Sequence, residues 1–489
     1  MEEKVGWIEI ELGQLCDVVR GASPRPMGDP RYFTGAIPFI KIGDITKISG
    51  KTIFDSEIYV NEEGAKKSRL LKKGSLILSN SGTVCLPKFL GVDSCIHDGF
   101  VTFNNIPDFV SLNFLFHYFH YIRPYVIQKH KQGVTQVNLN TTIVKEFKIS
   151  LPSLPEQRAI VSKIEQLFSE LDNGISNLKL AQEQLKVYRQ AVLKKAFEGE
   201  LTRKWREQQT DLPDAGDLLE QIRKEREEAA RASGEKLKAV KSFAETELLE
   251  FSKLPKEWTW ARVEETSSHI VDCLHSTAKF VDSGFYCIDT TCIENGKILF
   301  ENARLVNEET YKDRIRRLKP ESGDILFSRE GTVGTTVITP GNVNLCLGQR
   351  MMMFRPLKKI TPKFFMYYFQ SMLFSKQYKP LIGGTTSPHL NIRDIIQLKF
   401  PICSLPEQQA IVQEIETRLS VCDKIEQDIE TNLEKAEELR QSILKKAFEG
   451  KLLNERELVE VRGAEDWEPA EVLLEKIKAE KGQNGKNIH

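Results

Sequence analysis

The sequence lacks the features that mark membrane proteins, disulfide-rich secreted proteins and zinc ribbons. No stretch approaches the roughly 18 uninterrupted apolar residues that a membrane helix needs. The nine cysteines include no CxxC pair, so neither a disulfide framework nor a zinc ribbon is indicated. The first residues, MEEKVGWIEI, carry acidic side chains where a secretory signal carries basic ones. These absences predict a cytoplasmic protein without a membrane partner.

Motifs of several common catalytic sites are missing as well. Adenine methyltransferases that use S-adenosylmethionine carry a D/N/S-P-P-Y/F/W loop, and no such tetrapeptide occurs. The nearest approach to a phosphate-binding loop, from Gly43 to Thr52, has six residues between its glycines instead of four. No PD…(D/E)xK, GxSxG or HExxH arrangement is present that would support a hydrolytic site. We therefore expect no catalytic residues, metal or cofactor in this chain.

One pair of histidines could bind a metal ion, and one pair of cysteines is closely spaced. His117 and His120, in the run LFHYFHYI, lie one helical turn apart and could hold a metal ion. Because no acidic or cysteine partners match them, packing of an amphipathic helix is the favoured interpretation. Cys287 and Cys292 are the most closely spaced cysteines, and we interpret both as buried strand residues.

The formal net charge is zero, but the charges are unevenly distributed. Residues 1–150 contain 18 Lys and Arg against 15 Asp and Glu, and residues 254–400 contain 20 against 15. The remaining segments together carry a net charge of −8. Two mildly basic blocks thus alternate with two acidic ones. This pattern suits contact with DNA by the basic blocks and contact with proteins by the acidic blocks.

What the sequence does contain is a tandem repeat with a spacing of 251 residues. SLPEQRAIVSKIEQLF, from Ser153, returns as SLPEQQAIVQEIETRL from Ser404. LKKAFEGEL, from Leu193, returns as LKKAFEGKL from Leu444, and weaker matches extend the repeat over the whole chain. The order is variable block, helical block, variable block, helical block. Such a contrast between like and unlike blocks indicates two different binding surfaces on one repeated frame.

Each helical block carries the signals of one long helix. Ser153 and Ser404 are candidate N-caps, each followed three residues later by glutamate, which is the capping-box spacing. Gly199 and Gly450 stand where C-caps belong. A helix from residue 155 to residue 198 would be about 65 Å long at roughly 1.5 Å per residue. Apolar residues recur in steps of three and four, as in a coiled coil, at Ile160, Ile164, Leu167, Leu171, Ile175, Leu178, Leu185, Tyr188 and Val192 and, in the second copy, at Ile411, Ile415, Leu419, Cys422, Ile429, Leu433, Leu439 and Ile443.

A single helix with one apolar seam cannot bury that seam alone. We expect the two long helices to pack antiparallel, with pseudo-twofold symmetry and a globular block at each end. The alternative is that each helix packs only on its own globular block. The charged segments that follow, QIRKEREEAARASGEKLKAV and LLEKIKAEKGQ, are interpreted as solvated helices or docking arms that bury little.

The variable blocks mix strand-like runs such as IPFIKI and GDILFSR with turn residues. Each also has one aromatic helical segment, SLNFLFHYFHYI or TPKFFMYYFQSML. These segments could stack on bases, but their helical spacing and density of phenylalanine favour core packing. An α+β domain around a mixed or antiparallel sheet fits each block best.

Contact with DNA needs basic and amide side chains on loops, for phosphates, guanine and adenine. Taken singly, each such residue is better explained as a solvated surface side chain, but the set as a whole predicts an interface. In the first block the candidates are Lys66, Lys67, Arg69, Asn80, Gln132, Thr135, Gln136 and Asn138. In the second block they are Arg314, Arg316, Arg317, Lys319, Arg329, Gln349, Arg350, Thr385, Thr386 and Asn391.

The paired LPEQ and LKKAFEG motifs resemble the conserved regions of specificity subunits of type I restriction–modification systems. The order of variable and helical blocks matches that family over essentially the full length. We accordingly divide the chain into a first target-recognition domain (1–152), a first conserved helical region (153–232), a linker (233–253), a second target-recognition domain (254–403) and a second conserved helical region with a C-terminal tail (404–489).

The resemblance implies a specific role. Each target-recognition domain would read one half of a split, asymmetric site in double-stranded DNA, and the helices would set the number of unread base pairs between the halves. Two methyltransferase subunits would bind the helical regions, and restriction subunits would join them. S-adenosylmethionine, ATP and Mg would belong to those partners. The alternative, a non-catalytic coiled-coil scaffold for proteins, predicts no salt-sensitive affinity for DNA.

Overall fold

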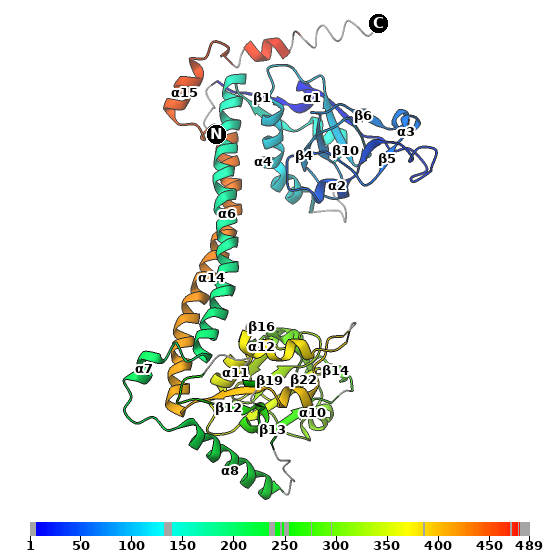
Figure 1. Ribbon diagram of the computed structural model, residues 1–489. Helices are drawn as coiled ribbons and strands as arrows, with labels where there is room; N and C mark the ends of the chain where they lie inside the picture. The colour runs from blue at the N-terminus through cyan, green and yellow to red at the C-terminus, as the bar shows by residue number, and fades with distance from the viewer. Residues whose placement is uncertain are drawn as a thin grey trace. The chain divides into compact units, whose positions relative to one another are not determined.

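The computed structural model describes residues 6–131, 139–233, 240–244, 247–248, 254–274, 276–294, 296–384, 387–469, 472–477 and 479. It divides into two compact units, Met1–Leu178 with Glu430–His489, and Lys179–Ile429. Each unit holds one globular domain and one part of each of two long helices, α6 (Leu154–Phe197) and α14 (Leu405–Phe448), which are labelled in Figure 1. Within the described ranges, no helix has the length and apolar character that crossing a membrane requires.

The first globular domain is built on two mixed sheets. The larger has the order β2 (Asp17–Arg20), β10 (Phe100–Asn104), β7 (Leu76–Ser79), β8 (Pro87–Leu90) and β4 (Thr52–Ile53). The smaller has the order β5 (Tyr59–Val60), β3 (Ile37–Ile40), β9 (Ser94–Ile96) and β6 (Arg69–Leu71). A separate antiparallel pair, β1 (Ile8–Glu11) with β11 (Lys148–Leu151), closes the domain just before α6. The strand β7 is buried along its whole length, which explains its unbroken apolar run.

The second globular domain has two four-stranded sheets. One has the order β13 (Ser267–Asp272), β22 (Met351–Pro356), β19 (Ile325–Ser328) and β20 (Thr336–Ile338). The other has the order β14 (Phe280–Val281), β18 (Arg304–Val306), β15 (Phe285–Ile288) and β21 (Leu345–Leu347). The closing pair is β12 (Thr259–Arg262) with β23 (Lys399–Ile402). A short hairpin, β16 (Ile293–Glu294) and β17 (Lys297–Ile298), completes the described strands.

The two domains share one topology despite their diverged sequences. The antiparallel order β2-β10-β7-β8 in the first domain matches β13-β22-β19-β20 in the second. A parallel pair, β3 with β9 or β15 with β21, lies in the other sheet of each domain. The predicted α+β domains on a repeated frame are therefore confirmed.

One further repeat was missed in the sequence. VNEE at residues 60–63 returns at 306–309, and it starts a helix in each domain, α3 (Glu62–Lys67) or α10 (Glu308–Ile315). Asn61 and Asn307 are the N-caps, and the side chain of each accepts a backbone N–H at 2.9 Å. The spacing here is 246 residues instead of 251 because the loops that follow differ in length, so a search at one fixed spacing does not find the match.

The glutamine of the repeated LPEQ motif ties each long helix to its globular domain. The Nε2 of Gln157 donates to the carbonyl oxygens of Phe109 and Pro152, at 3.0 and 2.9 Å. Its Oε1 accepts the backbone N–H of Ser111 at 2.8 Å. Gln408 makes the same three contacts in the second repeat, with Lys359, Cys403 and Thr361. The motif is therefore repeated because both helices begin against the same main-chain frame.

The glutamate of this motif does not complete the predicted capping box. The Oγ of the N-cap Ser404 accepts the backbone N–H of Glu407 at 3.4 Å, which is one half of the box. The Glu407 carboxylate instead accepts the indole N–H of Trp258 at 2.9 Å. Glu156 accepts the indole N–H of Trp7 in the same way, at 2.7 Å. Both glutamates are buried beneath their domain, and an indole N–H donates to each of them.

The predicted C-caps are confirmed. Gly199 and Gly450 have φ of 75° and 73°, the left-handed conformation that glycine adopts without steric cost. The two hydrogen bonds of a Schellman motif are present in both copies, from Gly199 to Ala196 and Glu200 to Lys195, and from Gly450 to Ala447 and Lys451 to Lys446.

In each unit the two long helices run antiparallel and are joined by the same ion pair. Arg440 of α14 pairs with Asp172 of α6 in the unit of the first domain. Arg189 of α6 pairs with Asp423 of α14, at 2.7 Å, in the other unit. The two pairs correspond at the 251-residue spacing, with the roles of the helices exchanged, as the predicted pseudo-twofold repeat requires.

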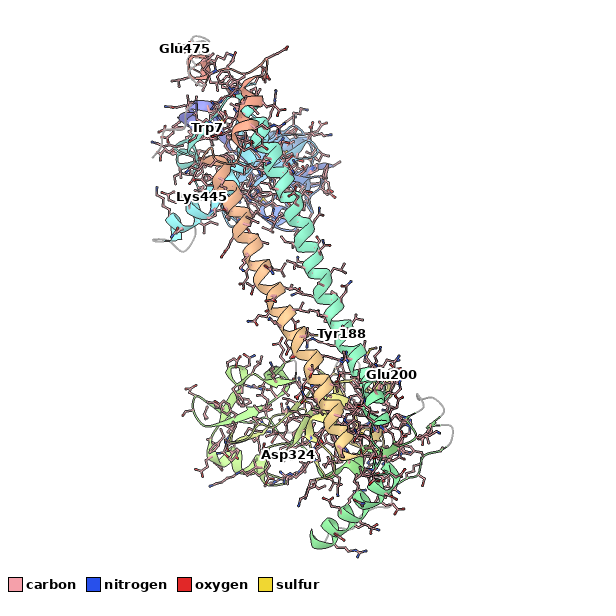
Figure 2. All side chains as sticks on the ribbon, turned by 90° about the vertical axis from the view of Figure 1, so that its left-hand side faces the viewer. Trp7, Tyr188, Glu200, Asp324, Lys445 and Glu475 are labelled. Atoms are coloured by element: carbon pink, nitrogen blue, oxygen red, sulfur yellow. The ribbon has the colours of Figure 1, made fainter. Side chains whose placement is uncertain are left out.

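The predicted apolar seam is wrong at one equivalent position in each copy. Ile164 and Ile415 are fully buried, but Tyr188 and Leu439 are 45% and 50% exposed (Tyr188 is labelled in Figure 2). The next residue in each copy, Arg189 or Arg440, makes the inter-helix ion pair. The basic side chain therefore takes the inward position, and its apolar neighbour faces outward.

The segments that follow the long helices are also better buried than expected. The helix α8 (Ala215–Ser233) buries Leu218, Leu219 and Ile222 in the core of the second domain. In the other unit, Leu473 and Ile477 are 1% and 5% exposed. The interpretation as solvated arms is wrong for Ile222, Leu473 and Ile477, because LLEQI and LLEKI place leucine and isoleucine on one helical face within a charged sequence.

The aromatic segments are core helices, as expected. They form α4 (Leu112–Lys131) in the first domain, and α11 (Pro362–Gln370) with α12 (Met372–Tyr378) in the second. The ring centroids of Phe114 and Phe448 lie 4.9 Å apart, and those of Phe364 and Phe197 lie 5.2 Å apart. Each domain is thus docked by equivalent aromatic contacts, on α14 in one unit and on α6 in the other.

The two histidines and the two closely spaced cysteines pack within the first and second domains. His117 and His120 lie on α4, and both rings make edge contacts with Phe116, at centroid distances of 5.3 and 4.8 Å. Cys287 lies buried in β15 as expected, whereas Cys292 lies buried in a 3-10 turn instead of a strand. In the described part of the chain, no three His, Cys, Asp or Glu side chains are grouped as metal ligands.

Candidate nucleic-acid interface

Three loops of the first domain meet at one edge of its larger sheet. Strand β2 ends at Arg20, Asn80 follows β7, and Asp98 lies in the turn from β9 into β10. The carbonyl oxygen of Asp98 accepts the Nε of Arg20 at 2.8 Å and the Nδ2 of Asn80 at 3.2 Å. The backbone N–H of Asn80 donates to the carbonyl of Gly99 at 2.9 Å. Polar groups far apart in the sequence are therefore fixed beside one another.

The carboxylate of Asp98 gathers a second set of groups at this edge. It lies 3.0 Å from the Oγ of Ser23, 3.3 Å from the Nη2 of Arg25 and 2.9 Å from the Nδ1 of His97. Burial opposes ionisation, but His97, Ser23 and Arg25 together hold the pKa of Asp98 below its ordinary value. This cluster was missed in the sequence, where its signal is a turn-rich segment with two arginines, RGASPR at 20–25.

The equivalent edge of the second domain has different chemistry. Arg329 follows β19 as Asn80 follows β7, and its guanidinium binds both carboxylate oxygens of Asp272, at 2.8 and 2.9 Å. Its Nη1 lies 2.8 Å from the carboxylate of Glu330. Burial opposes the charge, but the hydrogen bonds and charge of Asp272 raise the pKa of Arg329. The backbone N–H of Arg329 donates to the carbonyl of Arg350 at 2.9 Å, which links two loops.

The first-domain residues predicted from sequence divide into three groups. Lys66 and Lys67 are exposed at the end of α3, and Lys66 pairs with Glu63 at 2.8 Å. Arg69 and Asn80 lie at the polar edge, where the Nε of Arg69 donates to the carbonyl of Arg20 at 2.8 Å, but Asn80 is only 2% exposed and braces the loops. The predicted residues Gln132, Thr135, Gln136 and Asn138 lie outside the described residues.

The second-domain predictions also fall in different places. Arg314 and Arg329 are 8% and 7% exposed, and Arg314 donates to the carbonyl oxygens of Leu347 and Ser276, at 2.9 and 2.6 Å. These two arginines brace the loops instead of projecting from them. Exposed are Arg316, Arg317, Lys319 and Arg350. Gln349 is half-buried, and its Nε2 lies 3.2 Å from the Oγ1 of Thr277.

Of the last three residues predicted in the second domain, Asn391 has a local structural role. Asn391 stands at the N-cap of α13 (Ile392–Ile396), and its Nδ2 lies 3.2 Å from the carboxylate of Asp394. Its equivalent, Asn140, caps α5 (Thr141–Lys145) of the first domain. Thr385 and Thr386 lie outside the described residues.

The two edges correspond residue by residue. In the strand registers Arg20 pairs with Val101 and Asp272 pairs with Met352, and Val101 and Met352 are 251 residues apart. Four equivalent positions carry different side chains: Arg20 and Asp272, Asn80 and Arg329, Asp98 and Gln349, Gly99 and Arg350. One backbone frame thus carries two different sets of side chains, although Asn80 and Arg329 are themselves buried, at 2% and 7% exposed.

Comparison with known proteins gives the family. Residues 4–180 and 280–435 match the family model of the type I restriction modification DNA specificity domain. The chain belongs to this family. The resemblance expected from the LPEQ and LKKAFEG motifs is therefore confirmed, and DNA sequence specificity is implied by the family.

Curated specificity subunits are similar along nearly the whole chain. The chain is 23% identical to the specificity subunit of the type I restriction enzyme EcoDI from Escherichia coli over 494 residues, which cover 98% of this chain and 96% of that subunit. It is 22% identical to the EcoBI specificity subunit, also from Escherichia coli, over 98% of this chain and 93% of that subunit.

Solved structures share the fold. A chain from a structure of the assembly and conformational transition of the type I R-M system has a TM-score of 0.62 at 18% identity, over 91% of this chain and 98% of that one. The HsdS subunit from Thermoanaerobacter tengcongensis has a TM-score of 0.50 at 19% identity, over 92% and 99%. At these identities the likeness shows the fold of a specificity subunit and does not identify base-contacting residues.

Proposed function

We propose that this specificity subunit reads a bipartite, asymmetric target in double-stranded DNA, with one globular domain for each half. The observation that carries the proposal is the set of four equivalent positions with unlike side chains at the two polar edges. These positions hold Arg20, Asn80, Asp98 and Gly99 at one edge, and Asp272, Arg329, Gln349 and Arg350 at the other. Because the frame is shared and the donors differ, the two half-sequences should differ.

The proposal includes two methyltransferase subunits and restriction subunits as partners. Two identical partners need two equivalent surfaces, and the long helices offer them. Tyr188 and Leu439 occupy equivalent positions and are 45% and 50% exposed, although both are large and apolar. Methylation of adenine and cleavage, with S-adenosylmethionine, ATP and Mg, belong to those partners in this proposal. We infer that the complex acts on DNA in the cytoplasm.

A base-modification map tests this function. The gene is expressed with its methyltransferase partner in a host free of DNA methylation, and the genome is read by single-molecule sequencing. We expect adenine methylation in one bipartite motif, which disappears when this gene is omitted. A soluble complex with an active methyltransferase and no gene-dependent motif would reject the specificity role and favour the alternative of a protein scaffold.

A second measurement separates DNA binding from scaffolding. Affinity of the complex for DNA carrying the motif should fall steeply between 50 and 200 mM salt, because contacts with phosphate release counterions. A scaffold would have no such salt-sensitive affinity. DNA with the motif scrambled is the matched control, and it should bind more weakly at every salt concentration.

A further inference from the structure

Arg350 has a backbone conformation that its side chain disfavours. Its φ is 73°, in the left-handed region where a Cβ crowds the following carbonyl and where glycine is the usual residue. The conformation is held from both sides. The carbonyl of Arg350 accepts the N–H of Arg329 at 2.9 Å, and the carbonyl of Met351 accepts the N–H of Cys273 at 3.0 Å. Such strained residues gather at functional sites, where the surrounding structure holds them in place.

Unlike the other arginines of this domain that were predicted to contact DNA, Arg350 has a guanidinium whose N–H groups are not engaged by the described part of the protein. Five arginines of the second domain were predicted to contact DNA. Arg314 and Arg329 are buried and hydrogen-bonded, Arg316 pairs with Asp313, and Arg317 donates to the carbonyl of Asp272. Among the described residues, the exposed Arg350 side chain has neither an ion pair nor a hydrogen bond.

The position of this side chain is set by the loop beside it. The Nη1 of Arg350 lies 3.5 Å from the place where a Cβ on Gly331 would stand, so the guanidinium lies over the glycine of the loop that follows β19. Arg329 at the start of that loop is locked by Asp272 and Glu330. The locked arginine fixes the backbone from which the available arginine projects.

Resting on the proposed function, we propose that Arg350 reads a guanine in the half-target of the second domain, and that Arg329 is its positioning residue. A guanidinium can donate two parallel hydrogen bonds to the O6 and N7 of guanine in the major groove, which is a common specific contact. The equivalent position in the first domain is Gly99, which has no side chain. The half-target of the first domain is therefore read from other positions, such as Arg25.

The backbone supplies an unusual test, because Arg350→Gly should improve folding while removing the contact. Glycine relieves the left-handed conformation, so we expect the melting temperature of the complex with its methyltransferase to stay unchanged or rise. The methylation map should keep the first half-sequence and lose discrimination at one guanine of the second. At that position, methylation of sites with another base should rise about tenfold relative to the wild type.

A matched control is available in the same domain. Asn342 also has a positive φ, 62°, and lies in the loop between β20 and β21. This loop lies near the start of β19, where the N–H of Gly323 donates to the carbonyl of Thr339. Arg329 follows the other end of that strand, so Asn342 is remote from the proposed contact. Asn342→Gly relieves the same conformation without removing a guanidinium, and it should leave the motif unchanged. Arg350→Lys keeps the charge but not the paired donors, so it should also relax the guanine position.

Three outcomes overturn the proposal. An unchanged motif in Arg350→Gly would show that the side chain reads no base. A uniform fall in methylation at all sites, with the motif intact, would indicate a phosphate contact. Loss of discrimination in Asn342→Gly would indicate an effect of the backbone alone. If the wild-type protein directs no motif, the proposed function itself fails, and this result is distinct from a wild-type motif that Arg350→Gly leaves unaltered.

Discussion

Two histidines of the first domain, the buried His117 and the half-buried His120, have equivalents in the second domain that do not titrate near neutral pH. Tyr118 and Tyr368 each donate to a main-chain carbonyl at 2.9 Å, that of Lys148 or Lys399, and so they mark equivalent helix positions. By this alignment His117 and His120 correspond to Tyr367 and Gln370. Burial lowers the pKa of His117 to about 4 and that of His120 to about 3. The Glu165 carboxylate, 3.9 Å from the Nε2 of His117, favours the charged form but does not offset burial.

These histidines should make the first domain sensitive to acid. Their pKa values in the folded chain lie below the ordinary value of 6.5, so the unfolded chain takes up protons first as the pH falls. Stability should therefore decrease from about pH 6.5 downward, by about 3 kcal/mol for His117 alone once the pH reaches its folded pKa. Calorimetry at pH 7, 5.5 and 4.5 measures the loss.

The second domain supplies the substitutions for this test. His117→Tyr with His120→Gln places there the residues that α11 carries, and the double variant should lose less stability between pH 7 and 4.5 than the wild type. Parallel loss of stability in both proteins would mean that other groups cause the acid sensitivity.

The surroundings of three arginines of the second domain could not be predicted from the sequence. Arg314 and Arg329 were predicted to face DNA because they are basic residues that were expected to lie on loops. Their partners explain their burial, but Asp272 lies 57 residues from Arg329, and Leu347 lies 33 residues from Arg314. No local pattern reports contacts of that separation. Arg350 was predicted from its residue type, but its left-handed backbone could not be predicted, since glycine is the usual residue in that conformation.

At the level of elements, the starts of the two long helices have the same design but different electrostatics. The buried carboxylate of Glu407 accepts hydrogen bonds from Trp258, Thr202 and Arg206. Glu156 has the indole of Trp7 as its hydrogen-bond donor, and burial raises the pKa of Glu156. Position 457, equivalent to Arg206, is a glutamate. The second helix start therefore has a direct ion pair with Arg206, whereas at the first the charge of Arg462 only partly opposes the effect of burial on the pKa of Glu156.

The same substitution should consequently have unequal effects. Glu407→Gln leaves the charge of Arg206 without its buried partner, and should lower the free energy of unfolding by about 3 kcal/mol. Glu156→Gln keeps an oxygen that can accept from Trp7 and removes a buried charge, so its effect should stay within about 1 kcal/mol. Denaturant unfolding of the two variants beside the wild type measures both. Equal losses in the two variants would contradict the assigned role of Arg206.

Most elements could be predicted because their signals are local. Both 44-residue helices were expected from their heptads. Each begins at its LPEQ motif and ends within its AFEG motif. Tyr188 and Leu439 were misplaced because spacing alone does not distinguish an apolar seam residue from an apolar neighbour of an inward arginine. The burial of Ile222 was missed because α8 is strongly charged overall.

At the level of the whole molecule, the contact between domain and helices is repeated closely enough to permit an exchange. Phe448 packs on Phe114 and Tyr118 in one unit, and Phe197 packs on Phe364 and Tyr368 in the other. The two repeats also share the hydrogen bonds of the motif glutamine to the main chain, by Gln157 and Gln408. They share as well the hydrogen bond from an indole to the motif glutamate, by Trp7 and Trp258. A domain moved to the other repeat would therefore meet the same aromatic, amide and indole partners.

Replacing residues 258–403 by residues 7–152 should thus give a folded subunit with two copies of the first domain. Its expected methylation motif contains the first half-sequence twice, once in each orientation if the repeats are related by the expected twofold axis. The exchange removes the ion pairs of Arg223 with Glu265 and of Arg226 with Glu264, so solubility and methyltransferase binding are measured alongside the map. A soluble, active complex that still methylates the original second half would contradict the assignment of one half-target to each domain, because no residue of the second domain's polar edge would remain to read it.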